Sequence, residues 1–462
     1  MGKRKKIIWI ILILVLVVLV GFFIFSEKKI IIDKTNLTLQ TLSAAEKIVN
    51  FLPIKEDTKK EVETVNFLAQ ELAKSDGIER RYLILLQNNM ELRPGGGFLG
   101  QYAILKIKDG KVTSTFIEDA NLLDQRINVK VAPPYPFYRM MSLKKWKFRD
   151  SNFSPDFPTN VEKAKYFYRL SGGNSEFDGV ISVNATVLNK ILQITGPITV
   201  GGTQFNSDNA VLALEEKVEK VYILNENIDT QNRKWLIKEL GNQIISKLMQ
   251  LGNIPKLAEF GLEELRNKEI MLNFSNQQLQ DKVKEVHWDG SVLTDWNGDF
   301  LMMVDANMGA LKSDYYIKRD VYYEVDLSGE KPTAYLRITY NHTASHGDWR
   351  TSDYHSYLRV YTPLGSNLVE RKMVSYPNIQ EEFGKTAIGF ILHVLIGRQT
   401  VAEIRYELPE SVRENYKLLI QKQSGVGDIP LEVKIKDKDG KEHVVKETLK
   451  KDLKIEPSEE QQ

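Results

Sequence analysis

Residues 321–340, VYYEVDLSGEKPTAYLRITY, contain two runs in which apolar and polar side chains alternate, with turn residues between them. Successive side chains of a strand point to opposite faces of a sheet, so a period of two predicts strands with one buried face. Further strand-like runs follow at residues 357–361, 387–395, 401–406, 416–422 and 431–435. Their spacing is typical of a β-sandwich, which we expect over residues 321–449. The charged end, residues 450–462, is predicted to be a disordered tail.

Upstream, over residues 78–320, short apolar strands alternate with amphipathic helices. The runs at 102–107 and 112–117 are predicted to form a hairpin, because Asp109-Gly110 between them is a strong turn signal. Such alternation is typical of a layered α/β domain. Residues 26–77 show apolar side chains at helical spacing, and we expect them to form a helical stalk.

The chain opens on a basic segment, and the apolar run IIWIILILVLVVLVGFFIF follows at residues 7–25. About 19 residues at 1.5 Å each span roughly 28 Å, close to the hydrocarbon thickness of a bilayer. A cleaved signal peptide is the alternative, but its apolar region is usually shorter and ends in small residues. We therefore expect a single-pass protein of the cell membrane, with residues 1–6 as a cytoplasmic tail and the bulk of the chain extracytoplasmic. The expected fold class is α/β: an N-terminal transmembrane helix, a layered α/β domain and a C-terminal β-sandwich.

Composition narrows the classes of function. The formal net charge of the 462 residues is only +2, and basic residues are interspersed with acidic ones, so no nucleic-acid partner is expected. The chain has no cysteine, which excludes disulfides, Cys-based zinc sites and thiol nucleophiles.

A glycine-rich stretch is the first candidate site. Residues 95–100 satisfy the GxGxxG pattern of a dinucleotide site, but that motif requires a helix after it, and residues 101–107 alternate like a strand. Free backbone N–H groups beside Arg93 could instead hold an anion, and a tight structural turn is the alternative. The candidate ligand-binding residues of this loop are Arg93, Gly95, Gly96 and Gly97.

Acidic residues supply the second set of candidates. Asp119 closes a predicted strand, where α/β domains place their ligands, and Asp150 lies in a later loop. Asp229 and Arg233 are four residues apart at the start of a predicted helix, so they can face one site or form a surface salt bridge. Together with Arg93 they could form a phosphate cradle, with a divalent ion, for which Mg²⁺ is a candidate, held by acidic side chains.

Three segments carry a resemblance to a known family. They are Glu91–Gly100 (ELRPGGGFLG), Asp150–Pro158 (DSNFSPDFP) and Phe177–Val183 (FDGVISV). These segments resemble the signature of an uncharacterised bacterial membrane-associated family, the domain of unknown function 4012. The resemblance runs from about residue 83 to residue 409 and implies no particular activity.

A fainter similarity concerns residues 177–200 and 229–248, which resemble parts of the LytR-CpsA-Psr proteins. Those are membrane-anchored extracytoplasmic enzymes that transfer glycopolymers from polyprenyl pyrophosphate lipids to the cell wall, using arginines and an Asp-bound magnesium. The resemblance implies catalytic roles for Arg93, Asp119 and Arg233, with Asp119 near the metal. It further implies ligand contacts for Asp229 and for Lys217, which stands near that family's arginine pair.

Two hypotheses follow. In the first, a single-pass envelope protein binds or transfers polyprenyl-pyrophosphate-linked or wall glycans. In the second, the protein is a non-enzymatic envelope scaffold that docks a protein partner through aromatic loops near Trp146, Trp349 and Tyr354.

Overall fold

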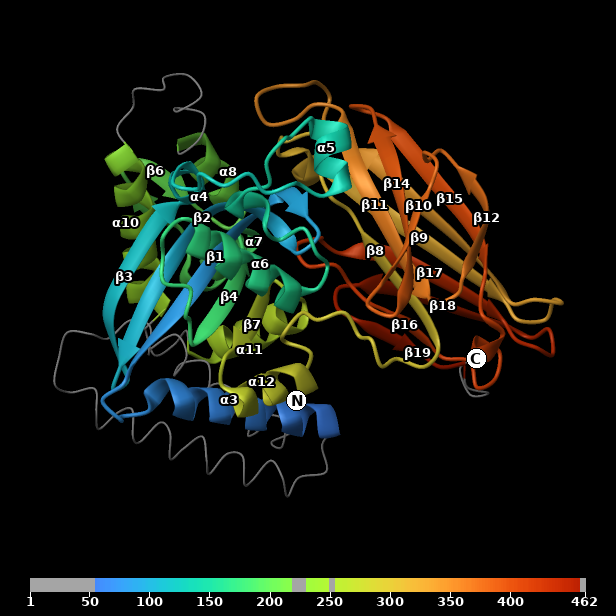
Figure 1. The fold of residues 1–462 in the computed structure, drawn as a ribbon, viewed down its shortest axis with the longest axis horizontal. Helices are drawn as coiled ribbons and strands as arrows, with labels where there is room; N and C mark the ends of the chain where they lie inside the picture. The colour runs from blue at the N-terminus through green and yellow to red at the C-terminus, as the bar shows by residue number, and fades with distance from the viewer. Residues whose placement is uncertain (1–54, 218–229, 249–253, 458–462) are drawn as a thin grey trace. The chain divides into compact units, whose positions relative to one another are not determined.

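The computed structural model describes residues 55–217, 230–248 and 254–457. The chain divides into two compact units whose segments interleave along the sequence (Figure 1). The first unit takes the described residues within 1–87, 99–126 and 168–290, and the second takes those within 88–98, 127–167 and 291–462. The predicted transmembrane helix, residues 7–25, lies outside the described residues.

The first unit is built on a mixed sheet with the strand order β3-β2-β1-β4-β7. Strand β4 pairs in parallel with β1 and antiparallel with β7, while β2 and β3 form an antiparallel hairpin. The bounds are β1 Glu79–Arg93, β2 Gly96–Lys108, β3 Lys111–Asp119, β4 Gly179–Asn184 and β7 Ile270–Phe274. At the hairpin turn, Asp109 and Gly110 both have positive φ, as a type I′ turn requires, so this predicted hairpin is confirmed.

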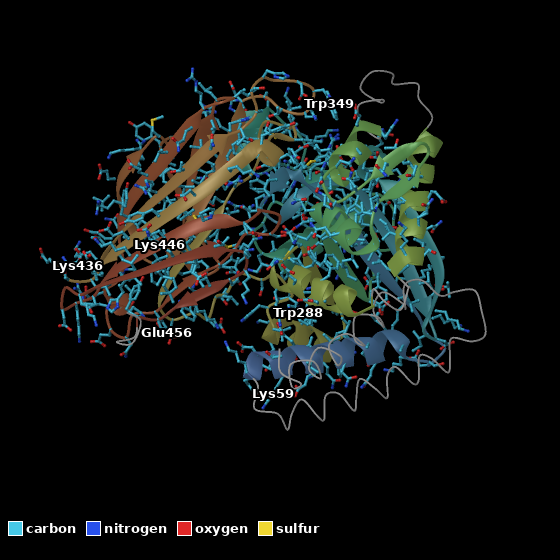
Figure 2. The ribbon with its side chains drawn as sticks, turned by 180° about the vertical axis from the view of Figure 1, so that it is seen from behind. Lys59, Trp288, Trp349, Lys436, Lys446 and Glu456 are labelled. Atoms are coloured by element: carbon cyan, nitrogen blue, oxygen red, sulfur yellow. The ribbon has the colours of Figure 1, made fainter. Side chains whose placement is uncertain are left out.

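The first unit also contains helices. Their bounds are α3 Glu56–Ala73, α4 Ala120–Gln125, α7 Thr186–Thr195, α8 Ala210–Glu215, α10 Thr230–Leu248, α11 Ile254–Arg266 and α12 Gln277–Glu285, with a small hairpin of β5 Ile198–Val200 and β6 Thr203–Phe205. Helix α3 falls in the segment predicted to be a stalk, and its apolar face is buried in the core of the first unit. Val65 and Leu68 share a hydrophobic cluster with Phe274 and with Trp288, which Figure 2 labels.

The second unit contains two six-stranded sheets. The first has the order β12 Asn367–Lys372, β15 Gln399–Glu407, β10 Thr333–His342, β9 Ile317–Asp326, β17 Ile429–Lys436 and β18 Glu442–Leu449. The second has the order β13 Asn378–Glu382, β14 Lys385–Val394, β11 Tyr354–Pro363, β8 Asp299–Val304, β16 Leu418–Ile420 and β19 Leu453–Ile455. Strand β19 lies inside the stretch that was predicted to be a disordered tail.

The two sheets share one hydrophobic core because their strands alternate. Buried and half-buried residues succeed each other along β10, and its inward residue Leu336 joins Tyr323 of β9. The facing sheet contributes Leu358 of β11 and Phe390 of β14 to the same cluster. Burying large apolar side chains of this kind stabilises a fold by about 1.5–3 kcal/mol each.

The outer face of the second sheet is covered by residues 127–167. This segment contains α5 Tyr135–Met141, the short 3-10 helix η1 Phe148–Asp150 and the start of α6 Phe157–Leu170. Phe137 and Phe153 pack against Met308 and Tyr357 in a separate hydrophobic cluster. An inserted segment and a sheet face therefore enclose space between them within the second unit.

The sequence-based fold class is wrong and needs correction. No helix in the described ranges is both long and apolar enough to cross a membrane. In place of successive α/β and β-sandwich domains, the chain folds into two interleaved units of mixed α and β structure, with residues 127–167 and 291–320 in the second unit. The physical reason is that periodicity reports the conformation of one segment, while pairing partners are set by contacts between segments distant in sequence.

Candidate ligand-binding site

Arg93, the central residue of the predicted phosphate site, lies at the end of β1 and is only 1% exposed. Its guanidinium donates hydrogen bonds to Glu91 Oε1 at 2.9 Å, to Asp150 Oδ1 at 3.1 Å and to the Asn307 carbonyl at 3.0 Å. The Lys312 ammonium adds a second cation, 3.3 Å from Glu91 Oε2. The structure therefore brings Arg93 and Asp150 together as partners in a buried ion cluster, where each charge is already compensated within the protein.

The glycines beside Arg93 belong to the tight connection between β1 and β2. The Gly95 N–H donates to the Asn152 carbonyl at 3.0 Å, and the Gly97 carbonyl accepts from Asn152 Nδ2 at 2.5 Å. A Cβ atom at Gly95 would overlap the Asn160 amide nitrogen, and one at Gly97 would overlap the backbone of the neighbouring strand. Gly96 has a φ of +127°. These contacts fit the structural-turn alternative, since the glycines allow close approach of the backbone to its neighbours.

The other predicted site residues lie in the first unit. Asp119 is the N-cap of α4, and its carboxylate accepts a hydrogen bond from the Asn121 N–H at 2.8 Å. Lys217 is exposed just after α8. Arg233 falls in α10, but its side chain and the whole of Asp229 lie outside the described structure, so their roles stay predictions.

A magnesium site in this region would need several oxygen ligands around the ion. Among the residues that the structure describes, no three histidine, aspartate or glutamate side chains gather as a metal site would require. The Asp119 carboxylate is half-exposed and already caps a helix, so the described donors do not fit the predicted ion.

A cleft of about 480 Å³ opens in the second unit, between the outer face of the second sheet and the covering segment. Ligand-binding clefts typically enclose roughly 300–1,000 Å³, so this one is large enough for a small ligand. Its lining is rich in aromatic rings and amides: Pro134, Tyr135, Pro136, Trp146, Ser151, Phe153, Ser154, Thr159, Asn160, Lys163, Tyr357, Arg359, Asn378, Gln380, Glu382 and Phe383.

The floor of the cleft follows from the strand register. Tyr357 and Arg359 are two residues apart on β11, so they project from the same face. Gly389 of β14 lies opposite Arg359, and the ring of Tyr357 lies across it, because a Cβ at Gly389 would overlap the Tyr357 hydroxyl. Asn378 of β13 donates to that hydroxyl at 3.2 Å. A glycine thus lets an aromatic ring lie flat on the sheet.

Arg359 is the charged centre of the floor and is buried. Its Nη2 donates to the Phe153 carbonyl at 2.8 Å, and its Nη1 lies 3.3 Å from Glu382 Oε2, which also accepts from the Tyr361 hydroxyl at 2.5 Å. The Arg359 Nε and the Ser151 hydroxyl, both in the lining, are buried without a hydrogen-bond partner. Buried polar atoms are normally hydrogen-bonded, so these two are exceptions within the lining.

The opposite wall presents aromatic rings to the cleft. Trp146 is fixed by the hydrogen bond from its Nε1 to the Asp150 carbonyl at 2.8 Å, and the Lys163 ammonium lies 4.6 Å from the centre of its ring. Tyr135 on α5 is 50% exposed, and its ring stands 6.3 Å from the ring of Tyr357 in an edge arrangement. Rigid rings with one open face suit an apolar ligand face.

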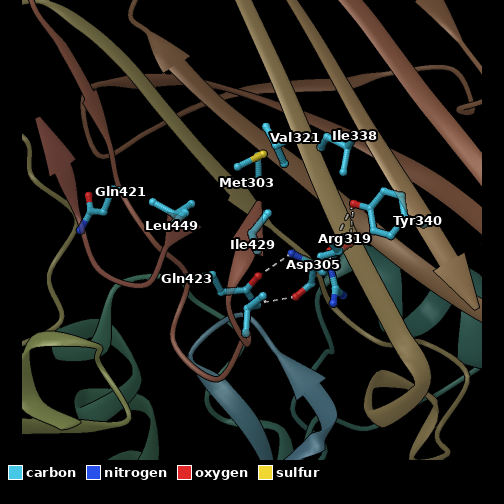
Figure 3. Close-up of a pocket in the computed structure, with 11 residues that line it drawn as sticks. Met303, Asp305, Arg319, Val321, Ile338, Tyr340, Gln421, Gln423, Ile429 and Leu449 are labelled. Carbon is cyan, nitrogen blue, oxygen red and sulfur yellow. Dashed lines mark hydrogen bonds and ion pairs between the residues drawn. The ribbon is translucent and has the colours of Figure 1, made fainter. Parts of the chain in front are cut away.

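A second, smaller cavity of about 20 Å³ lies between the two sheets (Figure 3). It has room for about one water molecule. Its charged residues pair with each other: Arg319 Nε donates to Asp305 Oδ2 at 2.8 Å, and the Tyr340 hydroxyl donates to the same carboxylate at 3.2 Å. This cavity is part of the internal polar network of the core and too small for an organic ligand.

Sequence reasoning missed most of the cleft. It singled out Trp146 as an interface aromatic, but Tyr354, which it named for the same role, is buried with its hydroxyl donating to Asp314. The available signal was the pair Tyr357 and Arg359, which are two residues apart in a predicted strand and therefore lie on one face of it.

The fold and the cleft define a two-unit protein whose second unit has a cleft on one face of a β-sheet. Residues 77–218 match the model of a family described as "Protein of unknown function (DUF4012)". No curated protein matches the chain. Among solved structures, the X-ray structure of Lin1025 protein from Listeria innocua is similar at a TM-score of 0.20 and 13% identity, over 46% of this chain and 79% of that one. Neither match is described as a LytR-CpsA-Psr protein.

Proposed function

We propose that the protein is a non-catalytic binding module that holds a glycan in the cleft of the second unit. The observation that carries the proposal is the combination of Tyr135, Trp146 and Tyr357 with amide and carboxylate groups around one cleft. Sugar rings present C–H faces that pack on aromatic rings, and their hydroxyls pair with planar amide, guanidinium and carboxylate groups. Asn160, Gln380 and Asn378, beside Glu382, supply such groups.

The charge of the lining favours one kind of glycan. The lining contains two cationic side chains, Lys163 and Arg359, and one anionic side chain, Glu382, so its net charge is +1. Because Arg359 is paired with Glu382, Lys163 carries the surplus. A neutral glycan, or one bearing carboxylate or phosphate groups, therefore fits better than a cationic one.

Binding is favoured over transfer. The predicted catalytic cation, Arg93, is buried among Glu91 and Asp150, and gripping a pyrophosphate would require breaking those pairs. We further propose that the module works at the cell envelope, on lipid-linked or wall glycans, since the basic and apolar residues at the start of the chain favour an extracytoplasmic location. Protease added to intact cells should then remove the bulk of the chain, and a chain that survives like a cytosolic control contradicts this location.

The binding test compares two exposed tyrosines on the same helix. Tyr135 lines the cleft, whereas Tyr138, at 65% exposure, is not among the lining residues. The full chain, kept soluble in detergent, is applied to an array of neutral, carboxylated and phosphorylated oligosaccharides, and the best binder is titrated by tryptophan fluorescence. We expect Tyr135→Ala to weaken binding at least tenfold and Tyr138→Ala to leave it unchanged. Equal affinity of the two variants, or a wild-type chain that binds no oligosaccharide, contradicts the proposal.

A second candidate function is the docking of a protein partner. Tyr138 and Tyr376, at 65% and 86% exposure, are large aromatic side chains of the kind that anchor interfaces. In this case crosslinking in cells should yield one defined partner, and the double variant Tyr138→Ala with Tyr376→Ala should abolish that product. A crosslinking pattern unchanged by the double variant contradicts it.

A further inference from the structure

Two histidines face each other on adjacent strands of the second unit. His355 of β11 and His393 of β14 are directly opposite in the antiparallel register. Their Nδ1 atoms lie 2.5 Å apart, and the ring centres are 4.7 Å apart at an interplanar angle of 76°. His393 is exposed and His355 half-buried, so solvent reaches the pair.

The backbone holds both positions. The His355 carbonyl accepts a hydrogen bond from the Met308 N–H at 2.7 Å, and the His393 carbonyl accepts one from the Thr400 hydroxyl at 3.1 Å. Both residues also lie within paired strands, so their Cβ atoms are set by the sheet and not by loop motion. The convergence of the two rings is therefore built into the fold.

Two imidazole nitrogens at this distance require a proton or a metal ion between them. A neutral imidazole nitrogen either carries a proton or offers a lone pair, and two lone pairs at this distance repel each other. A proton or a metal ion between them removes the repulsion, and neutral imidazole is the commonest side-chain ligand of transition metals.

We propose that His355 and His393 chelate one divalent late transition-metal ion, such as Zn²⁺, Ni²⁺ or Cu²⁺. Zinc–nitrogen bonds of about 2.0–2.1 Å at a tetrahedral angle place the two nitrogens about 3.3 Å apart. The rings therefore have to separate by less than about 1 Å from the observed distance, a change that exposed side chains make by small rotations about χ1 and χ2.

The remaining ligands of the ion are water. In the described part of the chain no third histidine or carboxylate joins the pair to form a group of three. The nearest charged neighbour in sequence is Asp353, whose Oδ1 is engaged by the Ile396 N–H at 2.9 Å. The site is thus open, and its order of affinity should follow the general preference for Cu²⁺ over Ni²⁺ and Zn²⁺.

The site is independent of the proposed glycan cleft, although it lies on the same sheet face. Alternation along β11 places His355, Tyr357 and Arg359 on one side of the strand. Two residues of a strand span roughly 7 Å, so the ion would lie one such step beyond Tyr357.

Calorimetric titration of the full chain tests the proposal. The chain carries no affinity tag, is stripped with EDTA, and is titrated separately with ZnCl₂ and NiCl₂. We expect one ion per chain and at least a tenfold loss of affinity in His355→Asn and in His393→Asn. His346→Asn is the matched control, because His346 is also exposed and contacts Ser345 instead of the pair.

Thermal unfolding without metal shows whether each variant is folded, and His393→Gln replaces any variant that is not. Added Zn²⁺ should raise the unfolding temperature of the wild type and of His346→Asn, but not of the pair variants. A wild-type chain that takes up no ion at millimolar Zn²⁺ or Ni²⁺ shows that the pair shares only a proton and overturns the proposal. Pair variants that bind as tightly as the wild type overturn it as well.

Discussion

At the scale of single residues, the chemistry of a side chain did not by itself reveal its task. Arg93 stands out in the sequence beside three glycines and was predicted to meet a phosphate. In the structure the same positive charge is compensated by Glu91 and Asp150, which are buried with it. Asp119, predicted to hold a metal, caps helix α4 in the structure. The role of each residue depends on the hydrogen-bond and ion-pair partners that the fold places beside it.

Replacing Arg93 should therefore act on stability. Arg93→Met leaves two buried carboxylates without their main cation, and breaking a buried ion pair in this way costs about 3–5 kcal/mol. Arg405→Met is the control, because Arg405 and Glu370 form an exposed pair at 3.9 Å, worth at most about 1 kcal/mol. The free energies of unfolding of both variants are measured by urea titration, with circular dichroism as the signal. An Arg93→Met chain as stable as the wild type would show that the cluster is not structural.

The buried carboxyl of Asp299 predicts a dependence of stability on pH. Burial raises its pKa to about 6, against the opposing effect of hydrogen bonds from the Tyr416 and Tyr323 hydroxyls at 2.7 and 2.8 Å. Between about pH 4 and pH 6 the folded chain keeps a proton that the unfolded chain has released. The free energy of unfolding therefore falls as the pH rises through this window, and the loss persists above it.

Asp299→Asn should remove this contribution. Its stability relative to the wild type should rise between pH 4 and pH 6 and then stay level, as measured by urea unfolding at a series of pH values. Asp326→Asn is a control of opposite sign, since hydrogen bonds from Ser328 and Lys436 lower the pKa of this carboxyl and its stabilising effect is lost in acid. A constant difference between Asp299→Asn and the wild type across the range would refute the assignment.

At the scale of elements, the local sequence predicts strands and turns better than it predicts binding sites. The alternation in residues 333–340 marks β10, and Asp109-Gly110 marks the β2–β3 turn, because each depends on neighbours along the chain. Gly389 shows the opposite case. It lies inside β14, where glycine is unfavourable. A glycine is needed there because the ring of Tyr357 on the next strand occupies the space of a side chain.

Gly389→Ala should disturb the cleft. The added methyl group overlaps the Tyr357 hydroxyl, so the ring has to move, and overpacking of this kind costs about 1–3 kcal/mol. Gly100→Ala in β2 is the matched control, because its Cβ would meet open space and should change stability by less than about 0.5 kcal/mol. Thermal unfolding measures the stability, and tryptophan fluorescence reports the cleft through Trp146. Equal effects of the two substitutions would contradict the proposed role of Gly389.

At the scale of the whole molecule, the interleaving of the two units governs how the chain can be divided. The sequence suggests a boundary near residue 321, but the second unit also draws on residues 88–98, 127–167 and 291–320. Strand β8 lies in the last of these segments and pairs with both β11 and β16. Without it, one sheet loses its central strand.

A fragment of residues 321–462 should therefore fail to fold. It lacks β8, which leaves the edges of β11 and β16 unpaired, and it lacks the segment that covers the outer sheet face. We expect a poorly dispersed amide NMR spectrum and no cooperative thermal transition, while the full chain in the same buffer shows both dispersion and cooperativity. A fragment that unfolds cooperatively would restore the boundary read from the sequence.

The sequence by itself determined the local features of this protein: which runs alternate, where the β2–β3 hairpin turns, and that residues 77–218 carry a family signature. Only the tertiary structure decided that Arg93 is neutralised, that residues 127–167 cover a sheet face, that Tyr357 lines a cleft, and that His393 lies against His355. The physical reason is range. A periodicity or a turn depends on neighbours a few residues away, whereas a cleft or a pair of facing histidines depends on side chains that only folding brings together.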